Sequence, residues 1–122
     1  MMSRTLPGLA AIAAFGLFSV PADAGFYSGN ELFDVCTTER ADPSHVEKTY
    51  ECVAYIAGAV DAFNTTREVN NLKSCIPARV TLSQLKDATV KYMRANPDDR
   101  DHSASALVFT ATRKAWPCSK KK

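Results

Sequence analysis

Four cysteines constrain the fold of this 122-residue chain more than any other feature: Cys36, Cys52, Cys75 and Cys118. An even number of cysteines in a small exported domain is typical of a disulfide framework. A zinc site is the competing interpretation, but such sites usually contain close C-x-x-C pairs, and this sequence has none. We therefore expect two disulfides, and four cysteines allow three pairings.

The first 24 residues have the pattern of a secretory signal peptide. Arg4 supplies the positive charge, residues 9–18 form an apolar run, and the run is followed by Pro21 and by the small-x-small sequence 22–24. The apolar run is shorter than the ~20 residues that span a bilayer. We expect cleavage between Ala24 and Gly25, which leaves residues 25–122 as an exported domain with no membrane segment.

Composition excludes several classes of protein. A 98-residue mature domain is too short for a two-domain enzyme or a barrel, and a 46% hydrophobic content argues against disorder. Without the three C-terminal lysines, the mature chain carries eleven Lys and Arg against twelve Asp and Glu. Such a balance provides no field that attracts nucleic acid or anionic lipid.

Apolar residues recur at three- and four-residue steps, and no segment alternates with a period of two, so we predict an all-α domain of four helices. The first runs from about Gly29 to Thr37, with Ser28 and Glu31 as a capping box. The second begins after Ser44, with Glu47 as the partner of its cap, and extends to about residue 64.

The third helix begins after Thr81, with Gln84 as the partner of its cap, and ends at the sequence 96–99. The fourth begins near Asp101 or Ser103, with Asp101 the favoured cap, and Pro117 stops it. The long second helix carries the widest apolar arc, so we expect it to be central. The stripe predicted to face the core is Val46, Tyr50, Val53, Ala57 and Val60, extended sideways by Cys52, Ile56, Ala59 and Phe63. The other predicted core positions are Leu32, Phe33, Val35, Cys36, Leu82, Leu85, Ala88, Tyr92, Met93, Ala104, Leu107, Val108, Ala111 and Ala115.

This helix order favours one disulfide pairing. A short link makes the first two helices neighbours, with Cys36 ending one and Cys52 early in the other. The last two helices form a similar hairpin, with Cys75 before it and Cys118 after it. We predict the pairs Cys36–Cys52 and Cys75–Cys118.

A search for catalytic and metal-binding patterns is negative. The two histidines, His45 and His102, lie at predicted helix starts, and three adjacent residues 101–103 cannot converge on one substrate atom as a catalytic triad must. The acidic run 98–101 lacks the Gly and the final Glu of a calcium loop. No phosphate loop, dinucleotide motif or nucleophile elbow is present. We expect no catalytic residue, metal or cofactor.

Several segments together resemble one family. Those segments are Gly29-Asn30-Glu31-Leu32 with Cys36; Cys52 to Ala62, with the pattern Y-I-x-G-x-x-D; Cys75-Ile76-Pro77 with Val80-Thr81 and Gln84-Leu85; and Lys91-Tyr92-Met93, Asn96-Pro97, Ser103-Ala104, Leu107-Val108 and Trp116-Pro117-Cys118. In these contexts the chain, from about Gly25 to Cys118, resembles the Rap/Tai group of type VI secretion amidase immunity proteins.

The resemblance implies a small, helical periplasmic binding protein that is not an enzyme, in a group whose members are often homodimers. Its implied partner is a secreted peptidoglycan amidase effector, whose active-site cleft it occludes. There are three other interpretations: a periplasmic acid-stress chaperone of the Hde type, a small hydrolase, which the missing catalytic residues disfavour, and a relative recruited to envelope maintenance without a toxin partner. Low-pH exposure of apolar surface would favour the chaperone.

Two predicted loops are candidates for the partner contact, because binding residues concentrate on loops of a rigid scaffold. The first candidate set is Asp98, Asp99 and Arg100, between the third and fourth helices. The second is Asn70 and Asn71, in a polar stretch expected to be a loop from Thr65 to Ser74.

Overall fold

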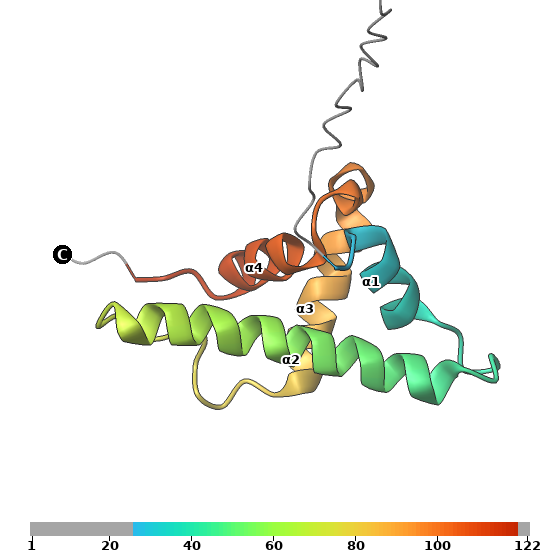
Figure 1. The fold of residues 1–122 in the computed structure, drawn as a ribbon, viewed down its shortest axis with the longest axis horizontal. Helices are drawn as coiled ribbons and strands as arrows, with labels where there is room; N and C mark the ends of the chain where they lie inside the picture. The colour runs from blue at the N-terminus through green and yellow to red at the C-terminus, as the bar shows by residue number, and fades with distance from the viewer. Residues whose placement is uncertain (1–25, 120–122) are drawn as a thin grey trace, which may run out of the picture.

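The computed structural model describes residues 26–119 and is all-α within that range, as predicted. Its helices are α1 (Gly29–Thr37), α2 (His45–Val69), α3 (Leu82–Ala95) and α4 (Ala104–Ala115), and a 3₁₀ helix, η1 (Pro97–Asp101), lies between the last two (Figure 1). The predicted leader, its cleavage site at Ala24 and Gly25, and the terminal lysines 120–122 lie outside the described residues.

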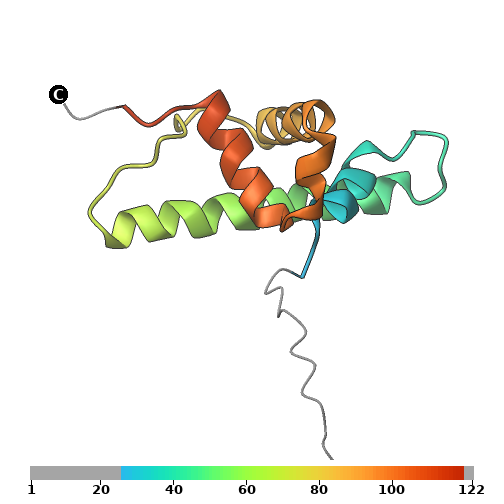
Figure 2. The same cartoon turned by 90° about the horizontal axis from the view of Figure 1, so that it is seen from above.

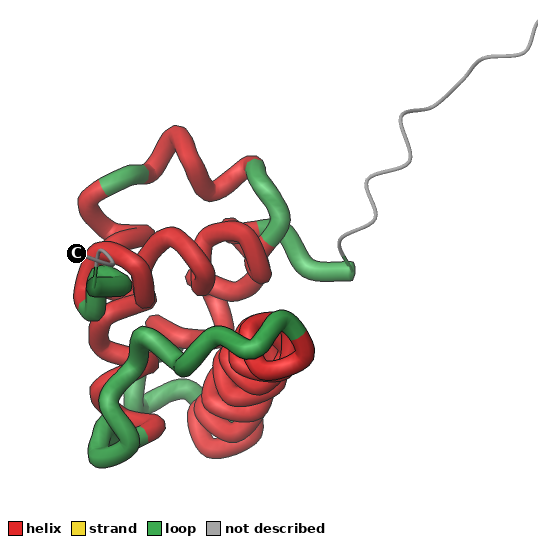
Figure 3. Tube along the Cα trace, turned by 90° about the vertical axis from the view of Figure 1, so that its left-hand side faces the viewer, coloured by secondary structure: helices red, strands yellow, loops and turns green. Residues whose placement is uncertain are grey.

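Helix α2 is the longest element and extends across the whole domain. In Figures 1 and 2, α1 lies over its N-terminal half and α4 over its C-terminal half, while α3 packs behind. Figure 3 looks almost along α2 and shows the other helices gathered on one side of it. Every pair among the four α-helices makes contact, so a single core is shared by all of them.

Helices α1 and α3 begin where their capping boxes predict. At α1, the Glu31 backbone N–H donates to Ser28 Oγ at 3.2 Å, and the Ser28 backbone N–H donates to Glu31 Oε2 at 2.7 Å. At α3, Thr81 and Gln84 exchange the equivalent bonds at 3.2 and 2.8 Å. Each box satisfies backbone N–H groups that a helix N-terminus leaves unpaired, which fixes the first helical residue locally.

Helix α2 begins directly after Ser44, as predicted, but it departs from the prediction in its cap and in its C-terminal end. The predicted capping box of Ser44 and Glu47 is absent, because the backbone of Ser44 has ψ 4° instead of the extended value that a cap requires. Its N–H and Oγ–H both donate to Asp42 Oδ1, at 2.8 and 2.6 Å, in a turn before the helix. At the other end no Gly or Pro interrupts residues 64–69, so α2 continues to Val69 instead of ending near residue 64.

The core confirms most predicted positions outside α2. The buried apolar side chains of α1, α3 and α4 are Leu32, Val35, Cys36, Leu85, Met93, Ala104, Leu107, Val108 and Ala111, whereas Leu82 and Ala115 are exposed. Two buried threonines, Thr89 and Thr112, were not predicted. Their hydroxyls donate to carbonyls of their own helix at 2.8 and 2.9 Å, so each buries its methyl group without leaving an unpaired polar atom.

The buried face of α2 agrees only in part with the predicted stripe. Cys52, Ile56 and Val60 are buried, at steps of four residues, whereas Val46 is 65% exposed and Tyr50 is 73% exposed. The true core face therefore combines Cys52 and Ile56, from the side extension, with Val60 from the predicted stripe. The N-terminal half of α2 keeps a second apolar face in solvent.

Both predicted disulfides are confirmed. Cys36–Cys52 joins the end of α1 to α2 with a Cα–Cα distance of 5.0 Å, and both half-cystines are buried. Cys75–Cys118 ties the segment before α3 to the segment after α4 with a Cα–Cα distance of 4.8 Å, and both are half-buried. The short α1–α2 and α3–α4 connections impose this pairing.

Candidate protein-interaction surface

The segment between α3 and α4 was predicted as a projecting loop, and it forms the short helix η1. Pro97 occupies its first turn, where the missing N–H has no partner to lose. The Asp99 N–H donates to Asn96 O at 3.2 Å, and the His102 N–H donates to Asp99 O at 3.0 Å, in the i→i+3 pattern of a 3₁₀ turn. The candidate residues therefore have a defined backbone.

Asp99 is tied to α3. The Tyr92 hydroxyl donates to Asp99 Oδ2 at 2.6 Å, and this bond raises the pKa of Tyr92 because a phenolate beside the carboxylate is disfavoured. The backbone carbonyl of Asp99 accepts a second bond, at 3.0 Å, from the ring N–H at Nδ1 of His102. The Asp99 carboxylate thus has a structural role that the sequence did not reveal.

Arg100 packs against α1. Its guanidinium lies 4.1 Å from the centroid of the Phe33 ring, in a cation–π contact. Its Nε is buried and has no hydrogen-bond partner among the described residues. The cation–π contact with Phe33 is therefore the main interaction of the Arg100 side chain, and the Phe33 ring is only half-buried.

The chain before α1 clamps η1 and the start of α4. The Gly29 N–H donates to His102 O at 2.8 Å, and the Ala104 N–H donates to Tyr27 O at 2.8 Å. A Cβ at Gly29 would lie 2.8 Å from Arg100 Cα and would enter the side chain of Leu107. Only glycine allows so close an approach between η1 and α1.

Asp98 and Asp101, which lie on either side of Asp99 and Arg100, differ in their contacts. Asp98 is exposed and makes no hydrogen bond within the described part of the chain. Asp101 accepts a bond from Asn30 Nδ2 at 2.9 Å, and the cap position of α4 is Ser103. The favoured cap, Asp101, is therefore wrong, and the alternative start near Ser103 is confirmed, because η1 extends to Asp101 before α4 begins.

The second candidate pair, Asn70 and Asn71, ends α2 in a Schellman motif. The Leu72 N–H donates to Arg67 O at 2.9 Å, and the Asn71 N–H donates to Glu68 O at 2.9 Å. Asn71 has φ 56°, the only positive φ of a non-glycine residue in the described range. The expected loop from Thr65 to Ser74 thus shrinks to the residues after Val69.

The two candidate sets lie apart. In Figures 1 and 2, η1 lies near α1, whereas the turn at Asn70 and Asn71 lies at the far end of α2, beside the C-terminal part of the described chain. The fold does not bring the two sets together into one surface.

A third feature, which no pattern in the sequence indicates, is a groove of about 720 Å³ between α3 and the segment that links α1 to α2. We term it the α3 groove. Its lining includes four cations and two anions: Arg40, Lys86, Lys91 and Arg94, against Glu39 and Asp87. Lys86, Val90 and Arg94 are spaced four residues apart, so they lie on one face of α3 and form one wall of the groove. The opposite wall comes from a segment more than forty positions earlier in the chain.

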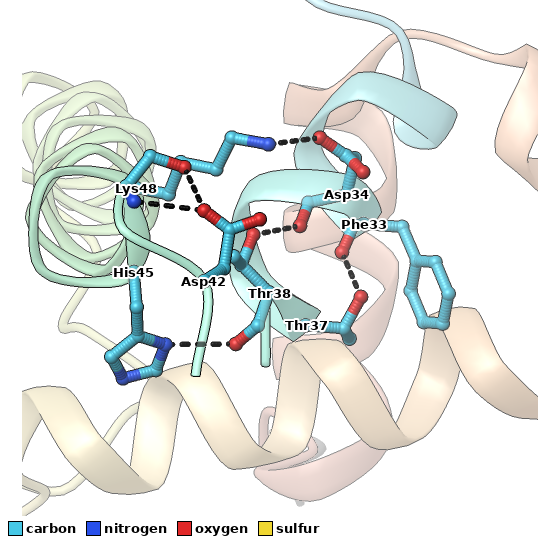
Figure 4. Close-up of polar contacts among 8 residues, drawn as sticks. Phe33, Asp34, Thr37, Thr38, Asp42, His45 and Lys48 are labelled. Atoms are coloured by element: carbon cyan, nitrogen blue, oxygen red, sulfur yellow. Dashed lines mark hydrogen bonds and ion pairs between the residues drawn. The ribbon is translucent and has the colours of Figure 1, made fainter. Parts of the chain in front are cut away.

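The wall opposite α3 is held by hydrogen bonds around the start of α2, and the imidazole of His45 lies over the ribbon of α3 (Figure 4). His45 Nδ1 lies 2.8 Å from Thr38 O, and a carbonyl only accepts, so this nitrogen carries the proton. Lys48 Nζ pairs with Asp34 Oδ2 at 3.0 Å, which raises the pKa of Lys48. The bonds from Ser44 hold the pKa of Asp42 below its ordinary value.

No group of three or more His, Cys, Asp or Glu side chains in residues 26–119 is arranged to hold a metal ion. None of the helices in that range combines the length and the apolar composition that a membrane crossing requires. What the described surface offers is a rigid helical scaffold with one basic groove and two anchored turns.

Comparison with known proteins identifies a family. A family model described as Rap1a immunity proteins matches residues 28–118. This range contains all four α-helices, η1 and both disulfides. No curated protein and no solved structure matches the chain.

Proposed function

The chain belongs to the Rap1a immunity protein family, and we propose that it is an immunity protein that binds and neutralises a secreted effector. The observation that carries this proposal is the extent of the match, which includes every described helix. We further propose that the effector is a peptidoglycan amidase, that the protein acts in the periplasm after removal of residues 1–24, and that it blocks the enzyme by occluding its active-site cleft.

The physical properties of the domain support a binding role. Two disulfides and a shared core hold the loops in one arrangement, and a preorganised surface loses little entropy when it binds. Inhibition by occlusion requires no catalytic group in the inhibitor. The export pattern and the disulfides suit a protein that meets its partner outside the cytoplasm.

We propose that residues Asp98, Asp99 and Arg100 contact the effector, with the turn of Asn70 and Asn71 as the alternative. Asp98 is the best single probe of the first set, because it is exposed while Asp99 and Arg100 also hold η1 in place. Asn71→Gly is the best probe of the second, because glycine retains the positive φ of the turn and removes only the side chain.

A homodimer is also part of the proposal. Val46 and Tyr50 present an exposed apolar face on α2, and such a face is a common feature of interfaces. Light scattering on the purified protein should give twice the monomer mass, and Tyr50→Glu should return the monomer. A monomeric wild type would remove this part of the proposal.

The central test uses the exported protein and the amidases whose genes lie beside its own. Each amidase is incubated with purified peptidoglycan, with and without an equimolar amount of this protein, and the cleaved muropeptides are quantified by chromatography. We expect one amidase to be inhibited, with a matching complex in size-exclusion chromatography. The Asp98→Ala and Asn71→Gly variants then report which turn contributes to binding. Full activity of every amidase in the presence of this protein would contradict the proposed function.

A further inference from the structure

We propose that the α3 groove binds an acidic polypeptide segment of the effector. This inference rests on the proposed function, because it names the chemistry of the surface that such a partner presents. The basic residues that carry it, Arg40, Lys86, Lys91 and Arg94, belong to neither of the two turns considered above, although one end of the groove lies beside η1.

The charge of the groove stands out against that of the domain. Residues 26–119 carry eleven Lys and Arg and twelve Asp and Glu, yet four of the cations line this groove with only two anions. The one ion pair among the described residues joins Lys48 to Asp34, so none of the four groove cations is paired there. A cluster of unpaired cations in a concave site produces a positive potential that attracts acidic groups.

The two anions in the lining identify the kind of partner. Glu39 and Asp87 interrupt the cations, which is unfavourable for a uniform polyanion such as a nucleic acid or a lipid surface. A polypeptide can place carboxylates against Lys91 and Arg94 and keep neutral or basic side chains near the two anions. The concave shape also suits inserted side chains better than a flat membrane surface.

The walls of the groove are rigid. Cys36, in the lining, is joined to α2 by its disulfide, and Val90, also in the lining, packs against the buried core. The hydrogen bond from His45 Nδ1 to the Thr38 carbonyl joins the start of α2 to the start of the segment that links α1 to α2. A partner segment therefore meets a prepared site, which lowers the entropy lost on binding.

The groove ends beside η1. Ala95, in its lining, is the last residue of α3, and η1 begins two residues later. A partner seated in the groove is thus placed close to the exposed carboxylate of Asp98. The groove and η1 together would form one surface with a basic part and an acidic part, which imposes a direction on the bound segment.

Charge reversal tests the proposal. The variant Arg94→Glu reverses an exposed groove cation, and Arg79→Glu reverses an exposed cation that lies neither in the groove nor beside the turn of Asn70 and Asn71, with the same change of net charge. We expect the groove variant to lower the association rate with the inhibited amidase by about tenfold at low salt and to flatten its salt dependence. The control should change the rate by less than about twofold. Equal effects of the two variants would overturn the inference.

Folding is checked by circular dichroism and thermal melting. If the charge reversal unfolds the domain, Arg94→Gln replaces it, and an unchanged association rate in that variant also counts against the groove.

A partner-free arm separates this inference from the proposed function. Backbone amide shifts are followed by NMR while a hexaglutamate peptide is added to the wild-type protein. Shifts concentrated around Arg40, Lys86, Lys91 and Arg94 support the groove even if no neighbouring amidase is inhibited, whereas shifts spread over the surface contradict it. Binding to phosphatidylglycerol vesicles that is lost in the groove variant would assign the site to a membrane and overturn the inference.

Discussion

The hydroxyl of Tyr92 and the carboxylate of Asp99 are joined by a 2.6 Å hydrogen bond that fastens η1 to α3. Tyr92 also lies 5.0 Å beneath the ammonium of Lys114 on α4. One side chain thus connects three successive elements, and the position of η1 depends on it.

The first prediction concerns this bond. Tyr92→Phe should lower the free energy of unfolding by about 1 kcal/mol at pH 7, as expected for the loss of one hydrogen bond. Because folding raises the pKa of Tyr92, the stabilisation is complete below about pH 10 and is lost as the pH rises through the folded-state pKa. Urea unfolding at pH 7 and above pH 10 measures both effects. Tyr55→Phe is the control, because the hydroxyl of this half-buried tyrosine makes no hydrogen bond within the described residues, and an equal loss in that variant would contradict the assignment.

The second prediction compares two glycines. Gly29→Ala should destabilise the domain by about 1–3 kcal/mol, because the added methyl group meets Arg100 and Leu107. Gly58→Ala should stabilise it by roughly 0.5–1 kcal/mol, because that position is helical and nothing lies within 4 Å of the new atom. Thermal melting of the two variants should shift in opposite directions. Shifts in the same direction would show that the close approach at Gly29 is relaxed in solution.

The third prediction concerns the end of α2. Asn71→Ala should cost about 1 kcal/mol, because alanine tolerates a φ of 56° less well than asparagine does. Asn71→Gly should be neutral or slightly stabilising, since glycine is the usual residue at this position of a Schellman motif. Denaturant unfolding distinguishes them. The prediction fails if the alanine variant is at least as stable as the glycine variant.

The fourth prediction compares the capping box at the start of α1, which forms, with the one predicted at the start of α2, which does not. The bonds from Ser28 hold the pKa of Glu31 below its ordinary value of 4.5, so this stabilisation is present above about pH 4.5 and is lost as the pH falls through the folded-state pKa. The variant Glu31→Gln should therefore have a lower melting temperature than the wild type at pH 7. At acidic pH the difference in melting temperature between the two proteins should become smaller. Glu47→Gln, at the box that does not form, should leave the melting temperature unchanged. A pH-independent loss in Glu31→Gln would contradict the pKa argument.

The fifth prediction concerns the order of disulfide reduction. Cys36–Cys52 is buried and Cys75–Cys118 is half-buried, so a thiol reductant should open Cys75–Cys118 first in the folded protein. Alkylation followed by mass mapping identifies the opened pair. By the loop-entropy estimate, removal of the longer tie costs roughly 4 kcal/mol and removal of the shorter roughly 3 kcal/mol. Simultaneous opening of both pairs would mean that reduction requires global unfolding.

The candidate contacts show where sequence reasoning ends. Asp98, Asp99 and Arg100 were grouped because they are polar neighbours in one predicted loop. The fold separates their roles, because Asp99 meets Tyr92 and Arg100 meets Phe33, while Asp98 stays free. Those partners lie on other elements, and no local pattern identifies them.

The sequence by itself determined the features that depend on neighbours along the chain. The capping boxes at Ser28 and Thr81 specified where α1 and α3 begin, because each box is completed within four residues. The short α1–α2 and α3–α4 connections specified the pairs Cys36–Cys52 and Cys75–Cys118.

Only the tertiary structure decided which face of α2 is buried and which distant segments share a surface. Apolar residues cover so much of α2 that periodicity does not distinguish the face of Ile56 from that of Tyr50, and the choice is made by the helices that pack against it. The α3 groove likewise exists only because Arg40 and Lys91 are brought to opposite walls by that packing. The physical reason is the same in both cases: local bonds fix backbone conformation, but burial and charge clustering depend on contacts between elements far apart in the chain.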